Sequence, residues 1–232
     1  QDEDYKKKRV EILNNKPKQV QGTQEWLRKR QTCLTASNIT NIINNRNLDY
    51  ILLDKCGYDK LTFASGPAIR HGKKFEDVAV LIYENRTGLK LYSDYGCIPH
   101  EDFSFIAASP DGIDELGNVV EIKCVYSRQL TGLPKEDYYD QMQLQMEVFG
   151  LNKCFFLECE LREYLTYKDY KKDVYTDPNG NVDETKTNQN MEKGVIVMVT
   201  SDNEKTPLRY IYPPHLKMNH KEAKQWGKDQ KA

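Results

Sequence analysis

The sequence lacks long apolar stretches: hydrophobic types make up 38% of its 232 residues, and the mean hydropathy is −0.77. No run approaches the ~20 apolar residues that a helix needs to span a bilayer. The first residues, QDEDYKKKRVEIL, are charged throughout and lack the apolar core of a signal peptide. We therefore expect a soluble protein that acts inside a cell, without a membrane partner and without secretion.

Paired cysteine motifs are missing as well. The six cysteines are scattered without a Cys-x-x-Cys pair, and the four histidines are isolated. This pattern argues against a cysteine-rich zinc site. It favours the reduced thiols of an intracellular protein over a disulfide framework.

The chain has no excess of charge of either sign. Its 34 Lys and Arg residues against 35 Asp and Glu give a net charge of −1, which by itself does not indicate a nucleic-acid-binding protein. Basic residues gather locally, and each group alone is typical of a solvated face. These groups are Lys6–Arg9, Arg28–Arg30, Arg70–Lys74 and Lys168–Lys172. Arg28–Arg30 and Arg70–Lys74 are of further interest because they flank the motifs described below.

The central feature of the chain is the stretch Ser104–Tyr126, SFIAASPDGIDELGNVVEIKCVY. Its pattern predicts two strands, Phe105–Ala108 and Val119–Val125, joined by a polar turn. A turn centred on Leu116 would set Asp111 opposite Glu121, with Cβ atoms about 4.5–5.5 Å apart. Two carboxylates at that distance repel each other, and a divalent cation with oxygen ligands would offset the repulsion.

Lys123 shares the strand face of Glu121, because side chains alternate along a strand. There it can hold an attacking water or a phosphate oxygen, which would make the hairpin a metal-dependent phosphodiesterase site. The alternative is purely structural. An aspartate in a Pro-Asp-Gly turn is usually a turn residue, and alternating Glu and Lys usually form a solvated face.

Helical periodicity predicts several helices around this hairpin. Residues 67–87 form the clearest, with Glu76 at the margin of its apolar stripe as a candidate third ligand, since a buried carboxylate is costly unless paired. Tyr138–Phe149 also predicts a helix. Gln141 and Gln145 on it could hydrogen-bond a phosphate or a metal-bound water, although their position alone favours the helix surface. Further helices are predicted over residues 3–13, after an N-cap at Thr23, and after Ser37.

The remaining pattern predicts a mixed β-sheet flanked by helices, an α/β (α+β) fold. We expect a single domain over residues 1–232, with an N-terminal extension over 1–21. Strands are predicted at Cys154–Leu157, 194–200 and 208–212. Residues 168–193 predict an inserted polar hairpin or mobile loop, and residues 216–232 a C-terminal helix or tail.

Several motifs of the chain, taken in order, resemble the lambda-exonuclease or viral recombinase (YqaJ-like) family of the PD-(D/E)XK nuclease superfamily. The resemblance covers roughly residues 22–165 and implies that superfamily's restriction-endonuclease-like fold. It rests on Trp26-x-x-x-Arg30, Leu34-Thr35-Ala36-Ser37, Gly72-Lys73-Lys74-Phe75-Glu76, Ser109-Pro110-Asp111-Gly112, Glu121-Ile122-Lys123-Cys124 and Tyr138-x-x-Gln141-x-Gln143.

The resemblance also implies roles for individual residues. Asp111, Glu121 and the backbone carbonyl of Ile122 would bind the catalytic Mg²⁺, or Mn²⁺ in its place. Glu76 would serve a second metal, Lys123 would activate the attacking water, and Gln141 would lie beside it. Arg30 and Ser37 would hold the 5′-phosphate of the cleaved strand, and the candidate DNA contacts are Ile69, Tyr138 and Gln143.

These roles predict a Mg²⁺-dependent 5′→3′ DNA exonuclease that acts on duplex DNA with free 5′ ends, in viral recombination or repair. The family also implies a ring-shaped homotrimer and a single-strand annealing protein as partner. Compared with the phage exonuclease of this family, the segment between Lys123 and Tyr138 is shorter in this chain, and the segment 168–193 is longer. An endonuclease of the same superfamily and a catalytically silent DNA-binding module remain the alternatives.

Overall fold

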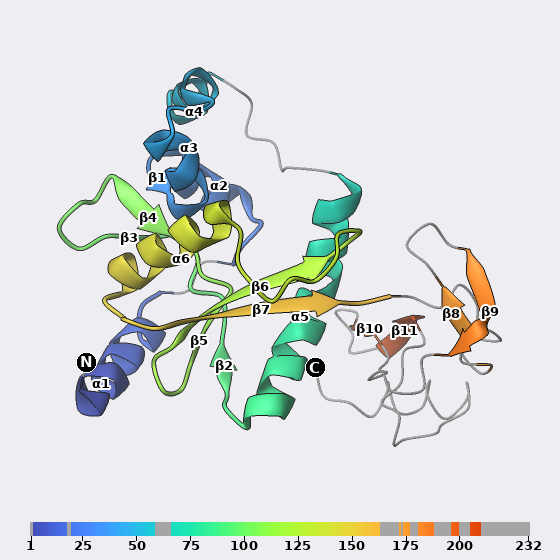
Figure 1. The fold of residues 1–232 in the computed structure, drawn as a ribbon. Helices are drawn as coiled ribbons and strands as arrows, with labels where there is room; N and C mark the ends of the chain where they lie inside the picture. Colours follow the sequence, from blue (N-terminus) through green and yellow to red (C-terminus); the bar gives the residue numbers. More distant parts are fainter. Residues whose placement is uncertain are drawn as a thin grey trace. The chain divides into compact units, whose positions relative to one another are not determined.

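A computed structural model describes residues 2–17, 20–58, 66–162, 172, 174–176, 181–187, 196–199 and 205–209 (Figure 1). The chain divides into two compact units, Gln1–Glu160 and Leu161–Ala232. The first unit contains all the candidate site residues. The expectation of one domain over the whole length stays a prediction.

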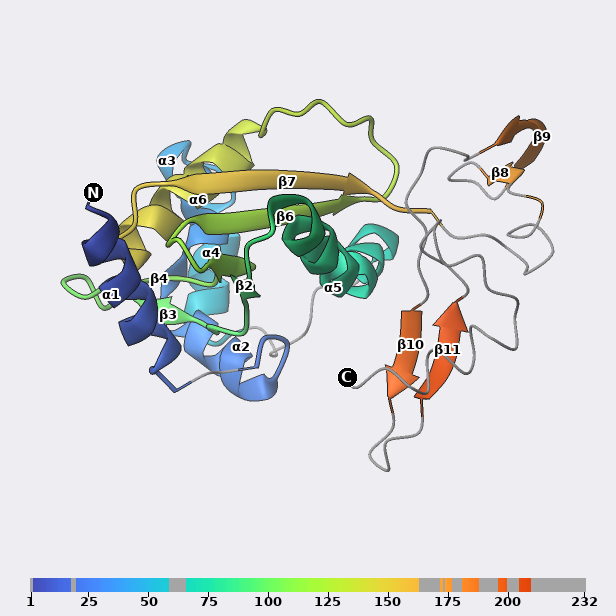
Figure 2. The ribbon, with the colours of Figure 1, turned by 90° about the horizontal axis from the view of Figure 1, so that it is seen from below.

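The first unit is built on two β-sheets. The larger has four strands in the order β2-β5-β6-β7, with β6 antiparallel to β5 and parallel to β7, so that β6 and β7 run side by side (Figure 2). Its strands are β2 (Leu91–Tyr92), β5 (Gly112–Asp114), β6 (Val119–Val125) and β7 (Cys154–Glu160). The smaller sheet has the order β1-β4-β3 and comprises β1 (Leu34–Thr35), β4 (Ile106–Ala108) and β3 (Ile98–Pro99).

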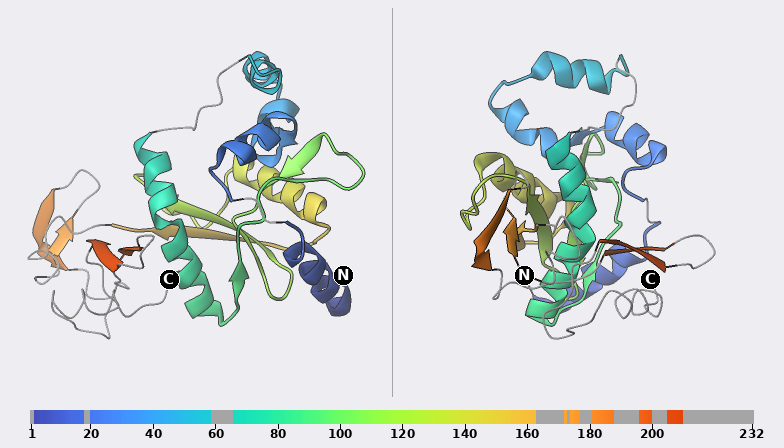
Figure 3. Two further views of the ribbon diagram at one scale, coloured as in Figure 1. Left: turned by 180° about the vertical axis from the view of Figure 1, so that it is seen from behind. Right: turned by 90° about the vertical axis from the view of Figure 1, so that its right-hand side faces the viewer.

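Helices flank these sheets, which confirms the predicted mixed α/β fold. They are α1 (Glu3–Asn14), α2 (Gln24–Gln31), the 3₁₀ helix η1 (Ala36–Asn38), α3 (Ile39–Ile43), α4 (Leu48–Lys55), α5 (Pro67–Thr87) and α6 (Glu136–Phe149). Seen from behind, α5 crosses in front of β6 and β7 (Figure 3). None of the described helices is both long and apolar enough to cross a membrane.

The two long helices cover different faces of the larger sheet. Tyr83 of α5 contacts Phe155, which pairs with Val120 on one face. Tyr138 of α6 contacts Phe156, which pairs with Glu121 on the other. Because α6 covers the Glu121 face, that face is not solvated as a typical surface strand would be.

The predicted extension over residues 1–21 packs into the first unit. Val10 and Leu13 of α1 are buried in its core, together with Ile113, Val119 and residues of α6. Arg9 also donates a hydrogen bond of 2.7 Å from Nε to the carbonyl oxygen of Phe149, at the end of α6. The N-terminal helix therefore contributes to the same core as the central hairpin.

The structure corrects two predicted strands. Phe105–Ala108 does not pair with Val119–Val125: β4 pairs with β1 and β3, and β5 takes its place in the hairpin. The chain changes sheets at Ser109-Pro110, where proline has no N–H to donate to a ladder. The strand at Cys154 runs on to Glu160 and is mostly half-buried rather than buried, because β7 is the last strand of its sheet among the described residues.

The second unit contains two antiparallel strand pairs among its described residues. β8 (Val174–Thr176) pairs with β9 (Val182–Thr187), inside the segment for which a polar hairpin or mobile loop was predicted. β10 (Ile196–Val199) pairs with β11 (Lys205–Arg209). The strand predicted at 208–212 thus begins earlier, and the tail predicted at 216–232 lies outside the described residues.

The turn between β5 and β6 is organised by a fully buried aspartate, Asp114. Its Oδ1 accepts hydrogen bonds from the backbone N–H groups of Leu116 (3.0 Å) and Asn118 (2.9 Å). Its Oδ2 accepts from the Asn118 side-chain amide and the Tyr83 hydroxyl, both at 2.8 Å. The turn is thereby joined to α5.

We expect Asp114→Ala to lower the free energy of unfolding by about 2–4 kcal/mol, because it leaves several buried donors without an acceptor. Tyr83→Phe removes one donor instead and should cost about 1 kcal/mol. Urea denaturation of both variants measures the difference. Equal losses would show that Asp114 does not organise the turn.

Candidate active site

The β5–β6 hairpin has the register that the sequence predicted. Gly112 pairs with Val120 and Ile113 with Val119, so the next position outward sets Asp111 opposite Glu121. Gly112 is required by a close approach, because a Cβ atom there would lie 2.6 Å from Cγ of Leu91. The hairpin therefore brings the two carboxylates together from adjacent strands.

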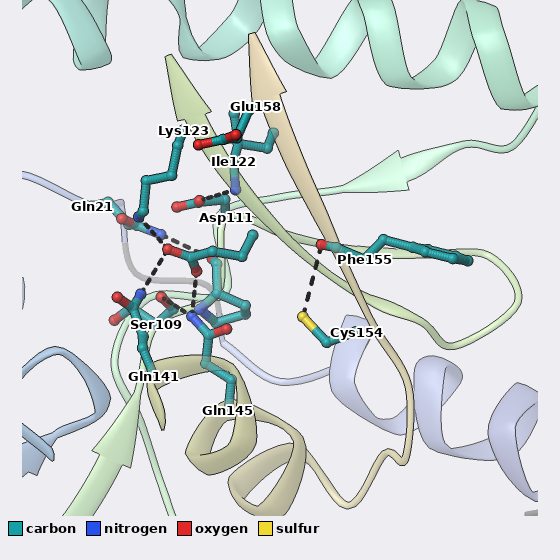
Figure 4. A network of polar contacts seen from close by, with 12 residues as sticks. Gln21, Ser109, Asp111, Ile122, Lys123, Gln141, Gln145, Cys154, Phe155 and Glu158 are labelled. Carbon is teal, nitrogen blue, oxygen red and sulfur yellow. Dashed lines mark hydrogen bonds and ion pairs between the residues drawn. The ribbon is translucent and has the colours of Figure 1, made fainter. Parts of the chain in front are cut away.

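Glu121 is fully buried and its carboxylate accepts several hydrogen bonds. The side chains of Lys123, Gln141 and Gln145 that bind it point toward one another in Figure 4. Oε1 forms an ion pair with Nζ of Lys123 and accepts from Nε2 of Gln141 at 2.8 Å. Oε2 accepts from Nε2 of Gln145 at 2.7 Å. The structural alternative, a solvated strand face, is thus wrong for Glu121, because α6 covers this part of the strand.

Asp111 is held by the strand that carries Glu121: its Oδ2 accepts a 2.7 Å hydrogen bond from the Ile122 N–H. Burial, and then the Glu121 carboxylate, hold the pKa of Asp111 well above its usual range. Burial also raises the pKa of Glu76, and Lys123 opposes the rise. Negative charge is therefore costly throughout this site.

Lys123 supplies positive charge to the pair. Burial alone would lower its pKa, but the Glu121 and Asp111 carboxylates raise the pKa of Lys123 above its usual value. Its Nζ lies 4.9 Å from the centroid of the Tyr138 ring. The lysine is therefore held as a cation between a carboxylate and an aromatic face.

The donor set of the site suits a hard divalent cation. Carboxylate and carbonyl oxygens are the ligands that Mg²⁺ prefers, and a cation between Asp111 and Glu121 would remove the repulsion that raises the Asp111 pKa. Within the part of the chain that the structure describes, no group of three or more His, Cys, Asp or Glu side chains is gathered for a metal. The fit thus depends on these two carboxylates, and the role of Glu76 stays a prediction.

Arg30 and Ser37 lie together, as the phosphate-pocket hypothesis requires. Nη2 of Arg30 donates to Oγ of Ser37 at 2.9 Å, and its guanidinium lies 4.6 Å from the Trp26 ring centroid. Burial lowers the pKa of Arg30, although a guanidinium remains charged at neutral pH. Ser37 is exposed and belongs to the one-turn helix η1.

A further contact connects this pair to the carboxylates. Nε1 of Trp26 donates to Oγ of Ser109 at 3.2 Å, and Ser109 lies two residues before Asp111. In the same stretch, Nε2 of Gln21 donates to the Pro110 carbonyl oxygen at 3.2 Å. Helix α2 and the segment before it therefore contact the connection between β4 and β5 that contains Asp111.

The candidate DNA contacts occupy different surroundings. Tyr138 stacks near Phe156 and Lys123 in the site, with 5.8 Å between the Tyr138 and Phe156 ring centroids. Ile69 is exposed near the start of α5, and Gln143 is exposed on α6. Their DNA contacts stay predictions.

The sequence reasoning missed one residue, Gln145. Its helical position alone favours the surface, yet its side chain is fully buried and donates a hydrogen bond to Glu121. The available signal was its spacing: Gln145 follows Gln141 by four residues, which places both amides on one side of α6.

Comparisons with known proteins concern the family and the fold of this chain. Residues 25–152 match the YqaJ-like viral recombinase domain. The crystal structure of an alkaline exonuclease, LHK-Exo from Laribacter hongkongensis, has a TM-score of 0.53 and 28% identity, covering 60% of this chain and 74% of that one. The complex of LHK-Exo with dAMP matches with the same values.

A viral protein is similar over nearly the whole chain. The R354 protein of Acanthamoeba polyphaga mimivirus is 31% identical over 248 aligned positions, which include 94% of this chain. The chain spans only 44% of the length of that protein.

The family match and the similarity in fold indicate a nuclease domain. Its mixed sheet is similar to that of an alkaline exonuclease, and its central hairpin carries the paired carboxylates and the lysine. The chain belongs to the YqaJ-like viral recombinase family, whose match covers more than half of its residues.

The loop between β6 and α6 is held beside this site by Glu158 of β7. Oε2 of Glu158 accepts hydrogen bonds from the N–H groups of Thr131 (3.3 Å) and Gly132 (3.2 Å). Oε1 forms an ion pair with Arg128, whose guanidinium lies 5.8 Å from the Tyr138 ring centroid. Glu158 thus fixes three points of one loop.

We expect Glu158→Gln to open this loop roughly tenfold more often, because losing the ion pair costs about 1.5 kcal/mol. The rate of trypsin cleavage after Arg128, followed by mass spectrometry, measures the opening. Glu11→Gln makes the same charge change on an exposed part of α1 and serves as the control. An unchanged rate in Glu158→Gln would contradict the role of the ion pair.

Proposed function

We propose that this domain is a divalent-metal-dependent 5′→3′ DNA exonuclease that degrades duplex DNA from free 5′ ends in viral recombination or repair. The observation that carries the proposal is the pairing of the half-buried Asp111 with the fully buried Glu121, with the Lys123 ammonium beside them. The similarity to an alkaline exonuclease that has also been crystallised with dAMP supports DNA as the substrate.

In the proposed enzyme, Asp111, Glu121 and the main-chain carbonyl of Ile122 hold Mg²⁺ or Mn²⁺, with Glu76 near a second ion. Such an ion lowers the pKa of a water and stabilises the attacking and leaving oxygens of a phosphodiester. Gln141 and Gln145 hold the Glu121 carboxylate through their amide groups.

Lys123 acts on the substrate side of the pair. Its ammonium places positive charge where negative charge develops on the phosphate during attack, and it holds the attacking water. Its role is therefore electrostatic and orienting.

Arg30 and Ser37 give the proposed enzyme its direction. An arginine binds a phosphate through parallel N–H groups, and a serine hydroxyl adds one more donor. A 5′-phosphate held there would fix the scissile bond at a set distance from the strand end. We further propose that the whole protein acts inside an infected cell, as a homotrimer, with a single-strand annealing protein as partner.

The proposal predicts that linear duplex DNA with a 5′-phosphate is degraded to mononucleotides from that end, in Mg²⁺ and not in EDTA. The same duplex with a 5′-hydroxyl should react about 10- to 100-fold more slowly, because the phosphate contacts are lost. In Arg30→Lys this preference should shrink, since lysine lacks the bidentate geometry. End-labelled duplexes, with products resolved by length, measure all three effects.

The variant Lys123→Ala tests, in the same assay, whether Lys123 contributes to the cleavage step. It should lower the cleavage rate roughly 100- to 1,000-fold while DNA affinity changes little, because one stabilising charge is lost at the reacting phosphate. Lys7→Ala, on an exposed part of α1, controls for the loss of a positive charge. Full activity of Lys123→Ala would refute the assignment of Lys123. Internal cuts by the unmodified protein, made without regard to DNA ends, would indicate an endonuclease. DNA binding without cleavage would indicate a catalytically silent module.

A further inference from the structure

Gln145 is a polar side chain whose burial needs an explanation. It is fully buried on α6, its Nε2 lies 2.7 Å from Oε2 of Glu121, and the same nitrogen lies 3.5 Å from the Ser109 carbonyl oxygen. It therefore touches both halves of the site: the strand that carries Glu121 and the segment that leads into Asp111.

The two oxygens of Glu121 receive their donors unequally. Lys123 and Gln141 both bind Oε1, whereas the Gln145 amide binds Oε2. The terminal torsion of a glutamate is broad and roughly twofold, so donors at one oxygen alone leave the carboxylate plane free to rotate. The contact with Gln145 at the second oxygen fixes that plane.

The Gln145 amide is itself oriented at a cost. A flip of this amide by 180° would place the Gln145 oxygen against the Glu121 carboxylate, and the two would repel each other. Oε1 of Gln145 must therefore point away from Glu121. In that position Oε1 is buried and accepts no hydrogen bond from the described residues. A buried acceptor without a partner destabilises a fold by about 1–3 kcal/mol, so packing alone would favour an apolar side chain of the same size at this position.

We propose that Gln145 is a positioning residue that fixes the Glu121 carboxylate in the orientation in which it binds the divalent ion. This inference rests on the proposed function, because it concerns the metal site at Asp111 and Glu121. Side chains that orient a metal ligand typically contribute 10- to 100-fold to metal affinity. Such a contribution would explain why an amide is kept where the core would accept a methionine.

The test is a calorimetric titration of Mn²⁺ into the full chain, without DNA, for the unmodified protein and Gln145→Met. Methionine matches glutamine in length and volume but cannot donate a hydrogen bond. We expect Mn²⁺ to bind Gln145→Met 10- to 100-fold more weakly. The exposed Gln24 at the start of α2 provides the control, and Gln24→Met should bind Mn²⁺ as the unmodified protein does.

Two further readouts separate positioning from a structural role. The Mn²⁺ concentration for half-maximal cleavage should rise in Gln145→Met, while the KM for DNA at saturating Mn²⁺ stays within about twofold of the unmodified value. The urea midpoint should change little, because removing the unpaired Oε1 offsets the lost donor. If Gln145→Met does not fold, Gln145→Asn withdraws the amide by one methylene and carries the same expectation.

The outcomes distinguish the inference from the proposed function. Equal Mn²⁺ affinity in the unmodified protein and Gln145→Met would overturn the role of Gln145 and leave the metal site intact. Failure of the unmodified protein to bind Mn²⁺ would overturn the proposed function as well. A loss of affinity in Gln145→Met alone supports both.

Discussion

The structure depends on a repulsion between two carboxylates that the hairpin forces into proximity. Asp111 lies directly before β5 and opposite Glu121 of β6, and burial, then the Glu121 carboxylate, raise the pKa of Asp111. The surrounding elements compensate with donors: Lys123 from the same strand, the Ile122 N–H, and two glutamines from α6. An arrangement that needs this much compensation is retained in a fold when it performs chemistry.

The turn of this hairpin contributes to stability, and the opposite end of its strands carries the candidate site. At its turn, Asp114 has all its acceptor capacity used by the backbone, Asn118 and Tyr83, which fixes the register. At its open end, the register determines which residue faces Glu121. A slip of one residue would turn the carboxylates to opposite faces of the sheet, so the rigid turn is a precondition of the site.

The local parts of this architecture could be predicted from the sequence because local rules determine them. Turn residues centred on Leu116 gave the pairing of Asp111 with Glu121, and Pro67 and Gly88 marked both ends of α5, where Gly88 adopts a φ of 72°. Long-range packing could not be read in this way. The pairing of β4 with β1 and β3 joins segments far apart in the sequence. The burial of Gln145 depends on which surface α6 covers, and helical periodicity gives the face of a helix but not its partner.

The central claim is that Asp111 and Glu121 together bind a divalent ion, and the anomalous diffraction of Mn²⁺ in crystals of the protein tests it most directly. The account predicts a manganese peak between the two carboxylates that disappears in Asp111→Ala. A peak elsewhere in the molecule, or one that persists between these strands in Asp111→Ala, would contradict it.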